Sequence, residues 1–243
     1  MQPIKKVNFA IGIQARSTSE RLPEKVFADI CGKPMLQWVI DAAFDCAKYN
    51  NRPNLNNKIS VSTSLLIPDR DKIKNHFSHS MEILEGSEFD VLSRYVDLAE
   101  YTGADYIVRI TGDCPLLPPP LITKAIMIAH MNKYDYVSNV DARLRLSADG
   151  HDVEVISKRL LKFVDENAKS KSDREHVTTF VRNGQLPSCF SVGYIVGYLD
   201  LADVKLSVDT EQDLERVRTH ARKMLDALDM AKKLSGGQNA HRF

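Results

Sequence analysis

The 243-residue sequence has little cysteine, and it has no excess of charge of either sign. Its four cysteines are far apart and form no Cys-x-x-Cys pair, which argues against a zinc site and against a disulfide framework. We therefore expect reduced thiols in a cytoplasmic protein. Lysine and arginine number 33 against 32 acidic residues, so the chain lacks the broad basic field that drives binding to nucleic acids or to membrane surfaces.

Long hydrophobic runs and known phosphate-binding loops are also missing. The N-terminal stretch MQPIKKVNFAIGI has too few apolar residues for a membrane-spanning helix and shows no signal-peptide cleavage pattern, so we expect a soluble protein. No solenoid repeat is present. Neither GxxxxGK[ST] nor GxGxxG occurs. Any phosphate chemistry must therefore be local and must depend on side chains as well as on backbone amides.

Short apolar runs alternate with longer segments of helical period. This pattern predicts an α/β fold with a mostly parallel central sheet and helices on both faces. The predicted strands of the first half cover 7–13, 58–65, 81–84, 105–110 and 135–138, and the predicted helices cover 34–49, 68–77, 88–103 and 118–133. Pro119 and Pro120 suit the first turn of the last of these helices.

After residue 140 the sequence changes to polar alternation with an Asp-Gly turn. This predicts a β-hairpin that leaves the main sheet over about 140–156, where it forms a dimer contact or covers a substrate. Helices are expected at about 157–168 and 173–182, strands over 188–196 and 204–208, and a long last helix capped by Asp209 or Thr210. We expect a single domain over 1–230 and a flexible tail over 231–243.

Three of the predicted strands end in charged residues. Strand 7–13 leads into a loop with Arg16, Arg21 and Lys25, strand 105–110 is followed by Asp113, and strand 204–208 is followed by Asp209. Ligands of open α/β sheets collect at the carboxyl ends of the strands. The loop from Arg16 to Lys25 spans at most roughly 30 Å, which lets its cations hold a polyphosphate from two sides. Each charge-assisted contact contributes about 1.5 to 3 kcal/mol.

Each of these charged groups also has a simpler interpretation. The three cations could form a solvated basic loop, Asp113 could be a turn residue, and Asp209 could be a helix cap. Carboxylates that face a polyphosphate are, however, the hard oxygen ligands that Mg²⁺ prefers. Because all of these groups follow strand ends, we favour a site for Mg²⁺ and a polyphosphate.

Seven segments in order resemble the acylneuraminate cytidylyltransferase superfamily, and most of all its SpsF-like, spore-coat-polysaccharide branch, which is related to 3-deoxy-manno-octulosonate cytidylyltransferase. They are IQARSTSERLPEKVFADICGKPMLQWVI, GSEFDVLSRY, ADYIVRITGDCPLL, YDYVSNVD, DGHDVEV, SKSDREHVT and LSVDTEQDLERVR. The resemblance covers about residues 9–218. It implies a Rossmann-like, GT-A-like nucleotidyltransferase fold, a homodimer, and transfer of CMP from CTP to a sugar or sugar-acid hydroxyl with release of pyrophosphate.

The resemblance also assigns roles to residues of this chain. Catalytic roles fall to Arg16, Lys25 and Asp113, and Mg²⁺ binding falls to Asp113 and Asp209. Nucleotide binding falls to a larger set, which comprises Gln14, Ala15, Arg16, Arg21, Lys25, Gly86, Ser87 and Asp113. The half of the chain where related enzymes bind the sugar offers Asp152, Glu154, Arg174, Glu175 and His176.

The acceptor residues keep an alternative interpretation. The planar fork of Arg174 could pair with an acceptor carboxylate, but Arg174 and the acids could equally form an internal ion-pair network. His176 is more often a hydrogen-bonded helix residue than a base. The sequence departs from the LPGK pattern of the family at Glu24. A carboxylate about 4 Å from a phosphate costs about 4 kcal/mol at an effective dielectric constant near 20, so we expect Glu24 to point away, toward Arg21. A positive φ there would add strain.

Other functions remain open from the sequence. A member of this branch could use another nucleoside triphosphate or a non-sugar acceptor. A nucleotide-sugar-dependent glycosyltransferase is less favoured because GDCPL contains no DxD metal motif. A catalytically silent binding protein is disfavoured because Arg16, Lys25, Asp113 and Asp209 are all present.

Overall fold

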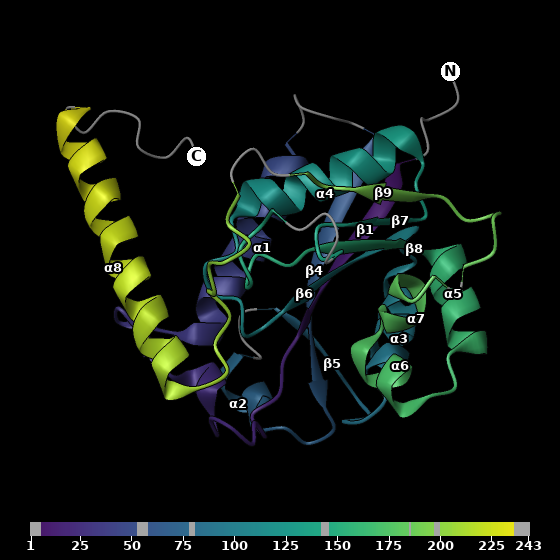
Figure 1. Cartoon of the computed structure of the whole chain (residues 1–243), viewed down its shortest axis with the longest axis horizontal. Helices are drawn as coiled ribbons and strands as arrows, with labels where there is room; N and C mark the ends of the chain where they lie inside the picture. The colour runs from purple at the N-terminus through teal and green to yellow at the C-terminus, as the bar shows by residue number, and fades with distance from the viewer. Residues whose placement is uncertain are drawn as a thin grey trace.

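The computed structural model describes residues 6–52, 58–77, 81–141, 146–184, 186–196 and 200–235. A seven-stranded sheet in the order β5-β4-β1-β6-β8-β7-β9 lies at its centre (Figure 1). The strands are β1 (Val7–Gln14), β4 (Ile59–Pro68), β5 (Glu82–Gly86), β6 (Tyr106–Thr111), β7 (Tyr136–Ser138), β8 (Glu154–Ser157) and β9 (Val192–Tyr194). Neighbouring strands are parallel except where β8 runs antiparallel to β6 and β7, so the predicted mostly parallel sheet is confirmed.

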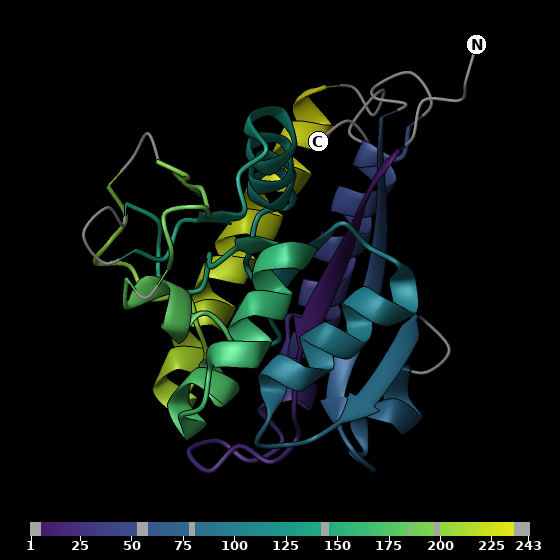
Figure 2. The same ribbon diagram turned by 90° about the vertical axis from the view of Figure 1, so that its right-hand side faces the viewer.

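Helices cover both faces of this sheet, as predicted (Figure 1, Figure 2). On one face α1 (Met35–Asn50), α4 (Pro119–Asn132) and the first half of α8 (Glu211–Leu234) contribute to one buried hydrophobic cluster. On the other face α3 (Val91–Thr102), α5 (Lys158–Asn167) and α7 (Thr179–Arg182) contribute to a second. Two short helices, α2 (Ile73–Phe77) and α6 (Lys171–His176), complete the set.

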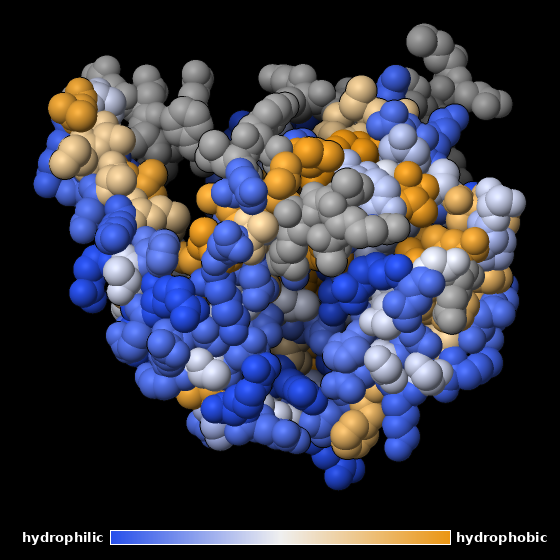
Figure 3. Space-filling model, in the orientation of Figure 1, coloured by the Kyte–Doolittle hydropathy of each residue, from blue (hydrophilic) through white to orange (hydrophobic). Residues whose placement is uncertain are grey.

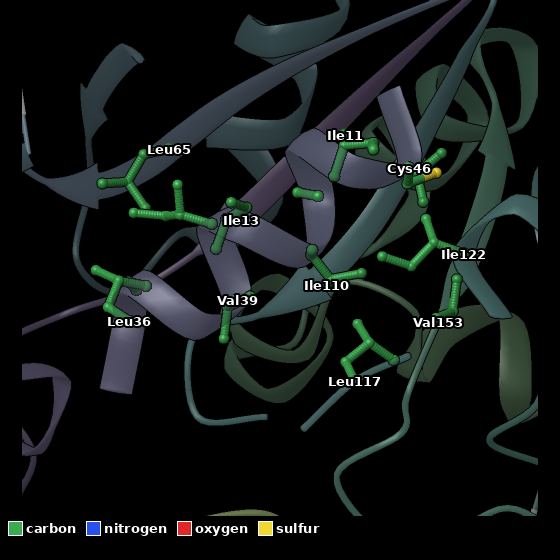
Figure 4. Close-up of a cluster of buried hydrophobic side chains, with 14 of the residues drawn as sticks. Ile11, Ile13, Leu36, Val39, Cys46, Leu65, Ile110, Leu117, Ile122 and Val153 are labelled. Carbon is green, nitrogen blue, oxygen red and sulfur yellow. The ribbon is translucent and has the colours of Figure 1, made fainter. Parts of the chain in front are cut away.

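The alternating side chains of β1 supply both clusters. Phe9, Ile11 and Ile13 point into the first cluster, where Figure 4 shows Ile11 and Ile13 near side chains of α1. On the opposite face Gly12 lets α3 pack closely, because a Cβ at this position would lie 2.7 Å from the ring of Tyr95. The central strand is therefore buried on both sides, as parallel strands in α/β proteins are.

Several predicted boundaries agree closely with the structure. Strand β1 ends one residue later than predicted, and α4 begins at Pro119 with proline in its first turn. Helix α8 begins with Thr210 as its N-cap: the Thr210 side chain accepts from the N–H of Asp213, and the Asp213 carboxylate accepts from the N–H of Thr210. This capping box decides between the two predicted caps in favour of Thr210.

The predicted excursion over 140–156 needs correction at its C-terminal end. Glu154 and the two residues after it belong to β8, which lies inside the main sheet between β6 and β7. The Asp-Gly turn packs on the segment at 204–207, where the N–H groups of Leu206 and Ser207 donate to the main-chain oxygen of Asp149. Gly150 permits this approach, because a Cβ there would lie 2.4 Å from the Leu206 backbone. Residues 142–145 lie outside the described residues.

Three further expectations differ from the structure. The helix predicted over 173–182 is divided into α6 and α7 at Val177, whose φ of 58° ends α6 and whose side chain is buried in the second cluster. The strand predicted over 204–208 forms one isolated bridge, from Lys205 to Asp149, because this segment pairs with the turn at Asp149 rather than with the sheet. Helix α8 reaches Leu234, so residues 231–234 are helical, and residues 236–243 lie outside the description.

Candidate active site

A cavity of about 810 Å³ opens at the carboxyl ends of β1 and β6. Gln14 at the end of β1 pairs with Thr111 at the end of β6, and the sheet order reverses here, since β4 and β5 lie on one side of β1 and β6 on the other. Open α/β sheets bind ligands at such a reversal point. In the view of Figure 1, β1 runs downward, away from α4. Figure 3 shows mostly hydrophilic residues over this lower part of the molecule.

Most of the residues that the sequence singles out line this cavity. They are Gln14, Ala15, Arg16, Arg21, Lys25, Asp113, Asp152, Glu154, Glu175, His176 and Asp209. Among the predicted site residues, Gly86, Ser87 and Arg174 are not part of the lining that the described residues form. The structure therefore brings together groups that are up to 195 positions apart in sequence, from Gln14 to Asp209.

Lys25 joins the two aspartates of the site. Its Nζ lies 3.2 Å from Asp113 Oδ2 and 3.5 Å from Asp209 Oδ1, and it donates to the main-chain oxygen of Val208 at 2.5 Å. The Lys25 side chain is only 11% exposed, whereas those of Asp113 and Asp209 are 33% and 23% exposed. The two carboxylates therefore converge at one point and stay open to the cavity.

The other two cations of the loop are more exposed. Arg21 Nη2 lies 2.8 Å from Asp209 Oδ1 with 65% of its side chain exposed. Arg16 Nη1 lies 4.0 Å from Glu88 Oε1 with 45% of its side chain exposed. Exposed ion pairs of this kind are weak, so both guanidinium groups can exchange their carboxylate partners for a ligand anion at little cost.

Glu24 adopts the positive φ of 61° that a glycine would adopt without strain. Its carboxylate points away from the aspartates and pairs with Lys72, which precedes α2. The expected partner, Arg21, is instead paired with Asp209. The loop thus tolerates Glu24 because a lysine distant in sequence neutralises it.

The ionisation of Asp113 reflects two opposing effects. Burial raises the pKa of the Asp113 carboxyl, but the charge of Lys25 and hydrogen bonds from Thr111 and Lys25 outweigh it and hold the pKa below its usual value. Asp113 is therefore an anion at neutral pH. The neighbouring Cys114 thiol has its pKa raised well above the usual value, mainly by burial and then by the charge of Asp113, so it stays protonated.

Asp209 is positioned by the first turn of α8. Lys205 Nζ bridges Asp209 Oδ2 at 3.2 Å and Asp213 Oδ2 at 2.8 Å, and the N–H of Asp209 donates to Asp213 Oδ2 at 3.1 Å. Burial raises the pKa of Asp213, but hydrogen bonds from Lys205, Arg216 and Thr210 prevail and hold it far below its usual value. Asp213, the third helical residue of the capping box, thus stays charged and holds the metal-binding candidate Asp209 in place.

Glu154, the first residue of β8, lines the cavity as part of an ion pair with Arg109 and not as a free acid. Glu154 is 1% exposed, and its Oε2 accepts from Arg109 Nη1 at 2.6 Å, while its Oε1 accepts from the hydroxyl of Tyr136. Arg109 Nη2 also donates to Gln14 Oε1 at 3.3 Å. Burial lowers the pKa of Arg109, but Glu154 outweighs it and the pKa is raised. Arg109 is therefore charged, and it and Glu154 are occupied with each other.

Arg174 is part of an internal ion-pair network, which is the second of the two roles that its sequence context allowed. Its guanidinium makes two hydrogen bonds to Asp90, at 2.6 and 2.9 Å, and a third to Asp165 at 2.7 Å. Asp90 is the N-cap of α3 and accepts from the N–H of Ser93. Arg174 therefore ties α6 to the start of α3, while its neighbours Glu175 and His176 line the cavity.

The glycine and serine before α3 lie close to the cavity without lining it. Ser87 Oγ accepts from the N–H of Asp90 at 3.0 Å. Gly86 is the last residue of β5, and a Cβ there would lie 2.8 Å from Cγ of Arg94. Gly86 thus leaves room for an arginine that does line the cavity.

The sequence reading missed several charged residues of the lining. They are Glu20, Glu88, Arg94, Arg109, Asp149 and Arg182. Arg94 and Arg109 lie in apolar segments, VLSRYV and YIVRIT, where a single charge interrupts a buried pattern. Such an interruption is a usable signal, since arginine is almost never fully buried without a partner.

The site's oxygen donors suit a divalent cation held in part by a ligand. Within the described residues no group of three or more histidine, cysteine, aspartate and glutamate side chains is placed to hold a metal ion. Asp113 and Asp209 provide two convergent carboxylates around a single point, now neutralised by Lys25. Mg²⁺ is commonly held by one or two carboxylates plus phosphate oxygens and water, so this pair fits the ion.

A mostly parallel sheet with a charged cavity at the carboxyl ends of its strands defines an α/β protein of the nucleotidyltransferase fold. The chain belongs to the cytidylyltransferase family, whose model matches residues 10–239. A spore coat polysaccharide biosynthesis protein of Bacillus subtilis, SpsF, is 28% identical over 211 residues, which are 85% of this chain and 83% of that protein. The 3-deoxy-manno-octulosonate cytidylyltransferase of Geobacter sulfurreducens is 30% identical over 146 residues, which are 59% of this chain and 54% of that protein.

Solved structures support the fold. A cytidylyltransferase from Leptospira borgpetersenii superposes with a TM-score of 0.75 at 22% identity, covering 95% of this chain and 96% of its own. CMP:2-keto-3-deoxy-manno-octonic acid synthetase complexed with CTP superposes with a TM-score of 0.65 at 15% identity, covering 89% and 99%. No helix in the described part of the chain is long and apolar enough to cross a membrane.

Proposed function

We propose that this chain transfers CMP from CTP to a hydroxyl group of a sugar or keto-sugar acid, with release of pyrophosphate, in surface polysaccharide or glycan biosynthesis. The observation that carries the proposal is the convergence of Lys25 with Asp113 and Asp209, beside Arg21 and Arg16, in one cavity at the ends of β1 and β6. Relatives named for 3-deoxy-manno-octulosonate and for spore coat polysaccharide support the acceptor class.

The reaction is an in-line displacement at the α-phosphorus. The acceptor hydroxyl forms a new bond to this phosphorus as the bond to pyrophosphate breaks, the hydroxyl proton passes to water, and negative charge builds on the phosphate oxygens. Arg16, Arg21 and Lys25 neutralise that charge in a cavity whose walls reduce solvent screening. Positioning and charge stabilisation supply the catalysis, and the proposal assigns no side chain as a general base.

Mg²⁺ is the proposed cofactor, held by Asp113 and Asp209. When bound, the ion neutralises phosphate charge and polarises oxygen atoms bound to it. Lys25 neutralises the same two carboxylates before the ion arrives. Lys25 thereby keeps the two acids close together in the free protein. Its ammonium group would be free to contact a phosphate once the ion is bound.

The homodimer is also a proposal, and we place its contact near residues 140–153, before β8 enters the main sheet. Light scattering of the purified chain should give the mass of two subunits. A monomeric mass at micromolar concentration would contradict it.

The function is tested by pyrophosphate release with CTP, UTP, GTP and ATP, each combined with a panel of sugar acids and neutral sugars, with and without Mg²⁺. We expect release with CTP and at least one sugar or sugar acid, and loss of release when the metal is removed by a chelator. Release with GTP alone would change the base assignment and leave the reaction class intact. No release with any pair would reject the proposed function.

A further inference from the structure

Arg94 is a buried arginine that forms no ion pair with a carboxylate in the described part of the chain. It lies in the second turn of α3, is 2% exposed and lines the cavity. Its Nη1 donates to the main-chain oxygen of Leu66 at 3.0 Å, and its Nε is buried without a hydrogen-bond partner among the described residues. Burial lowers the pKa of Arg94. An unpaired guanidinium of this kind is costly unless a ligand completes it.

The second buried arginine of the cavity shows what a structural role looks like. Arg109 also has an unpartnered Nε, but Glu154 neutralises its charge and Gln14 accepts another of its hydrogens. Among the described residues, the single hydrogen-bond partner of Arg94 is the Leu66 carbonyl. The space that Arg94 occupies depends on Gly86, where a Cβ would approach Arg94 Cγ to 2.8 Å.

The position of Arg94 suits a nucleobase better than a phosphate. The more exposed cations Arg16 and Arg21, together with Lys25, already face the open part of the cavity. A guanidinium only donates hydrogen bonds, and its paired N–H groups match two adjacent acceptors. Arginine reads O6 and N7 of guanine in DNA in this way.

Of the two pyrimidine bases, cytosine offers the matching edge. Its O2 and N3 are adjacent acceptors, whereas N3 of uracil carries a hydrogen that would face the guanidinium. We propose that Arg94 selects the base of the nucleotide, by donating hydrogen bonds to O2 and N3 of cytosine. This inference rests on the proposed function and adds to it the residue that distinguishes CTP from UTP.

The test measures nucleotide binding by isothermal titration calorimetry of the full chain without an acceptor. Wild-type protein should bind UTP and 3-deaza-CTP, in which N3 is replaced by C–H, about tenfold to a hundredfold more weakly than CTP, the range of one bidentate base contact. In Arg94→Lys the planar fork is lost, so CTP and 3-deaza-CTP should bind with equal affinity. Gly86→Ala should displace Arg94 and reduce the ratio of the affinity for CTP to the affinity for 3-deaza-CTP.

Arg159→Lys is the matched control, because Arg159 pairs with Asp135 outside the cavity lining. Its ratio of CTP affinity to 3-deaza-CTP affinity should equal that of the wild type.

Thermal melting checks that each variant is folded, and the comparison of CTP with 3-deaza-CTP in the wild type needs no variant. Equal binding of CTP and 3-deaza-CTP by the wild type, or an equal loss for CTP and UTP in Arg94→Lys, would overturn the role of Arg94. If pyrophosphate release with CTP persists in that case, the proposed function stands. Failure to bind any nucleoside triphosphate would reject both.

Discussion

The two halves of the cavity use charged residues differently. In the phosphate half, formed by Arg16, Arg21, Lys25, Asp113 and Asp209, the carboxylates and both arginines keep a quarter to two-thirds of their side chains accessible and pair across the opening. In the acceptor half, next to β8, the paired side chains of Glu154 and Arg109 are 1% and 14% exposed. Exposed pairs are easily exchanged for a ligand, whereas buried pairs are not, because breaking them leaves an uncompensated charge.

This difference predicts that mutations in the phosphate half lower activity and that mutations in the acceptor half first lower stability. Arg94 stands apart from both halves, since it is buried but forms no ion pair in the described residues. The following experiments test the contrast, beginning with the largest expected effect.

Asp113→Asn and Asp209→Asn should each lower turnover by orders of magnitude, because each removes a carboxylate proposed to hold Mg²⁺ and to position Lys25. The melting temperature should stay close to that of the wild type, since both side chains are partly exposed. Asp226→Asn, at an exposed position of α8, is the control and should keep wild-type turnover. Pyrophosphate release and thermal melting give the two readouts, and wild-type rates in either variant would remove that aspartate from the site.

Arg109→Met should lower the free energy of unfolding by about 3 to 5 kcal/mol, because it leaves Glu154 charged and buried without its partner. Urea unfolding measures the loss. The double variant Arg109→Met/Glu154→Gln should recover part of it. Lys158→Met removes an exposed pair with Glu100 and should cost less than about 1 kcal/mol. A loss in Arg109→Met no larger than in Lys158→Met would remove the contrast between the two halves.

Asp213→Asn tests the hydrogen bonds by which Asp213 holds Asp209 and Lys205 in place. It should lower the free energy of unfolding at pH 7 by about 2 kcal/mol. The native pKa of Asp213 lies below the unfolded value of 3.8. The stabilisation is therefore fully present above that value and is lost as the pH falls through the native pKa. Urea unfolding of wild type and variant across acidic pH should show the two curves converging. A difference that stays constant down to the lowest pH would contradict this linkage.

Arg174→Met should cost about 1 kcal/mol of stability, because its pairs with Asp90 and Asp165 are partly exposed. With an acceptor identified by pyrophosphate release, the KM of the variant for that acceptor should equal that of the wild type. A large rise in KM for an acidic acceptor, with CTP KM unaltered, would return Arg174 to the acceptor site and weaken the contrast.

The phosphate half was predictable because its residues are encoded locally. Arg16, Arg21 and Lys25 follow β1, Asp113 follows β6, and the ends of these two parallel strands meet at one edge of the sheet. Asp209 follows a segment that is not in the sheet, so its place in the site depends on the packing of that segment on the turn at Asp149. The acceptor half was less predictable, because its residue types suit both a ligand and an internal ion pair. Only the packing of α6 on α3 decided that Arg174 binds Asp90 and Asp165.

The same distinction holds for the fold. Alternating apolar runs and capping residues were sufficient to predict the strands near β1 and the start of α4, because these depend on residues close in sequence. The order and types of residues alone predicted the α/β class, the cationic loop and the two aspartates. Tertiary structure alone decided that β8 enters the main sheet, that Glu24 pairs with Lys72, and that Arg94 is buried with its Nη1 on the carbonyl of Leu66. Each of these depends on a partner far away in the chain, whose proximity follows from the packing of the whole domain and from no local pattern.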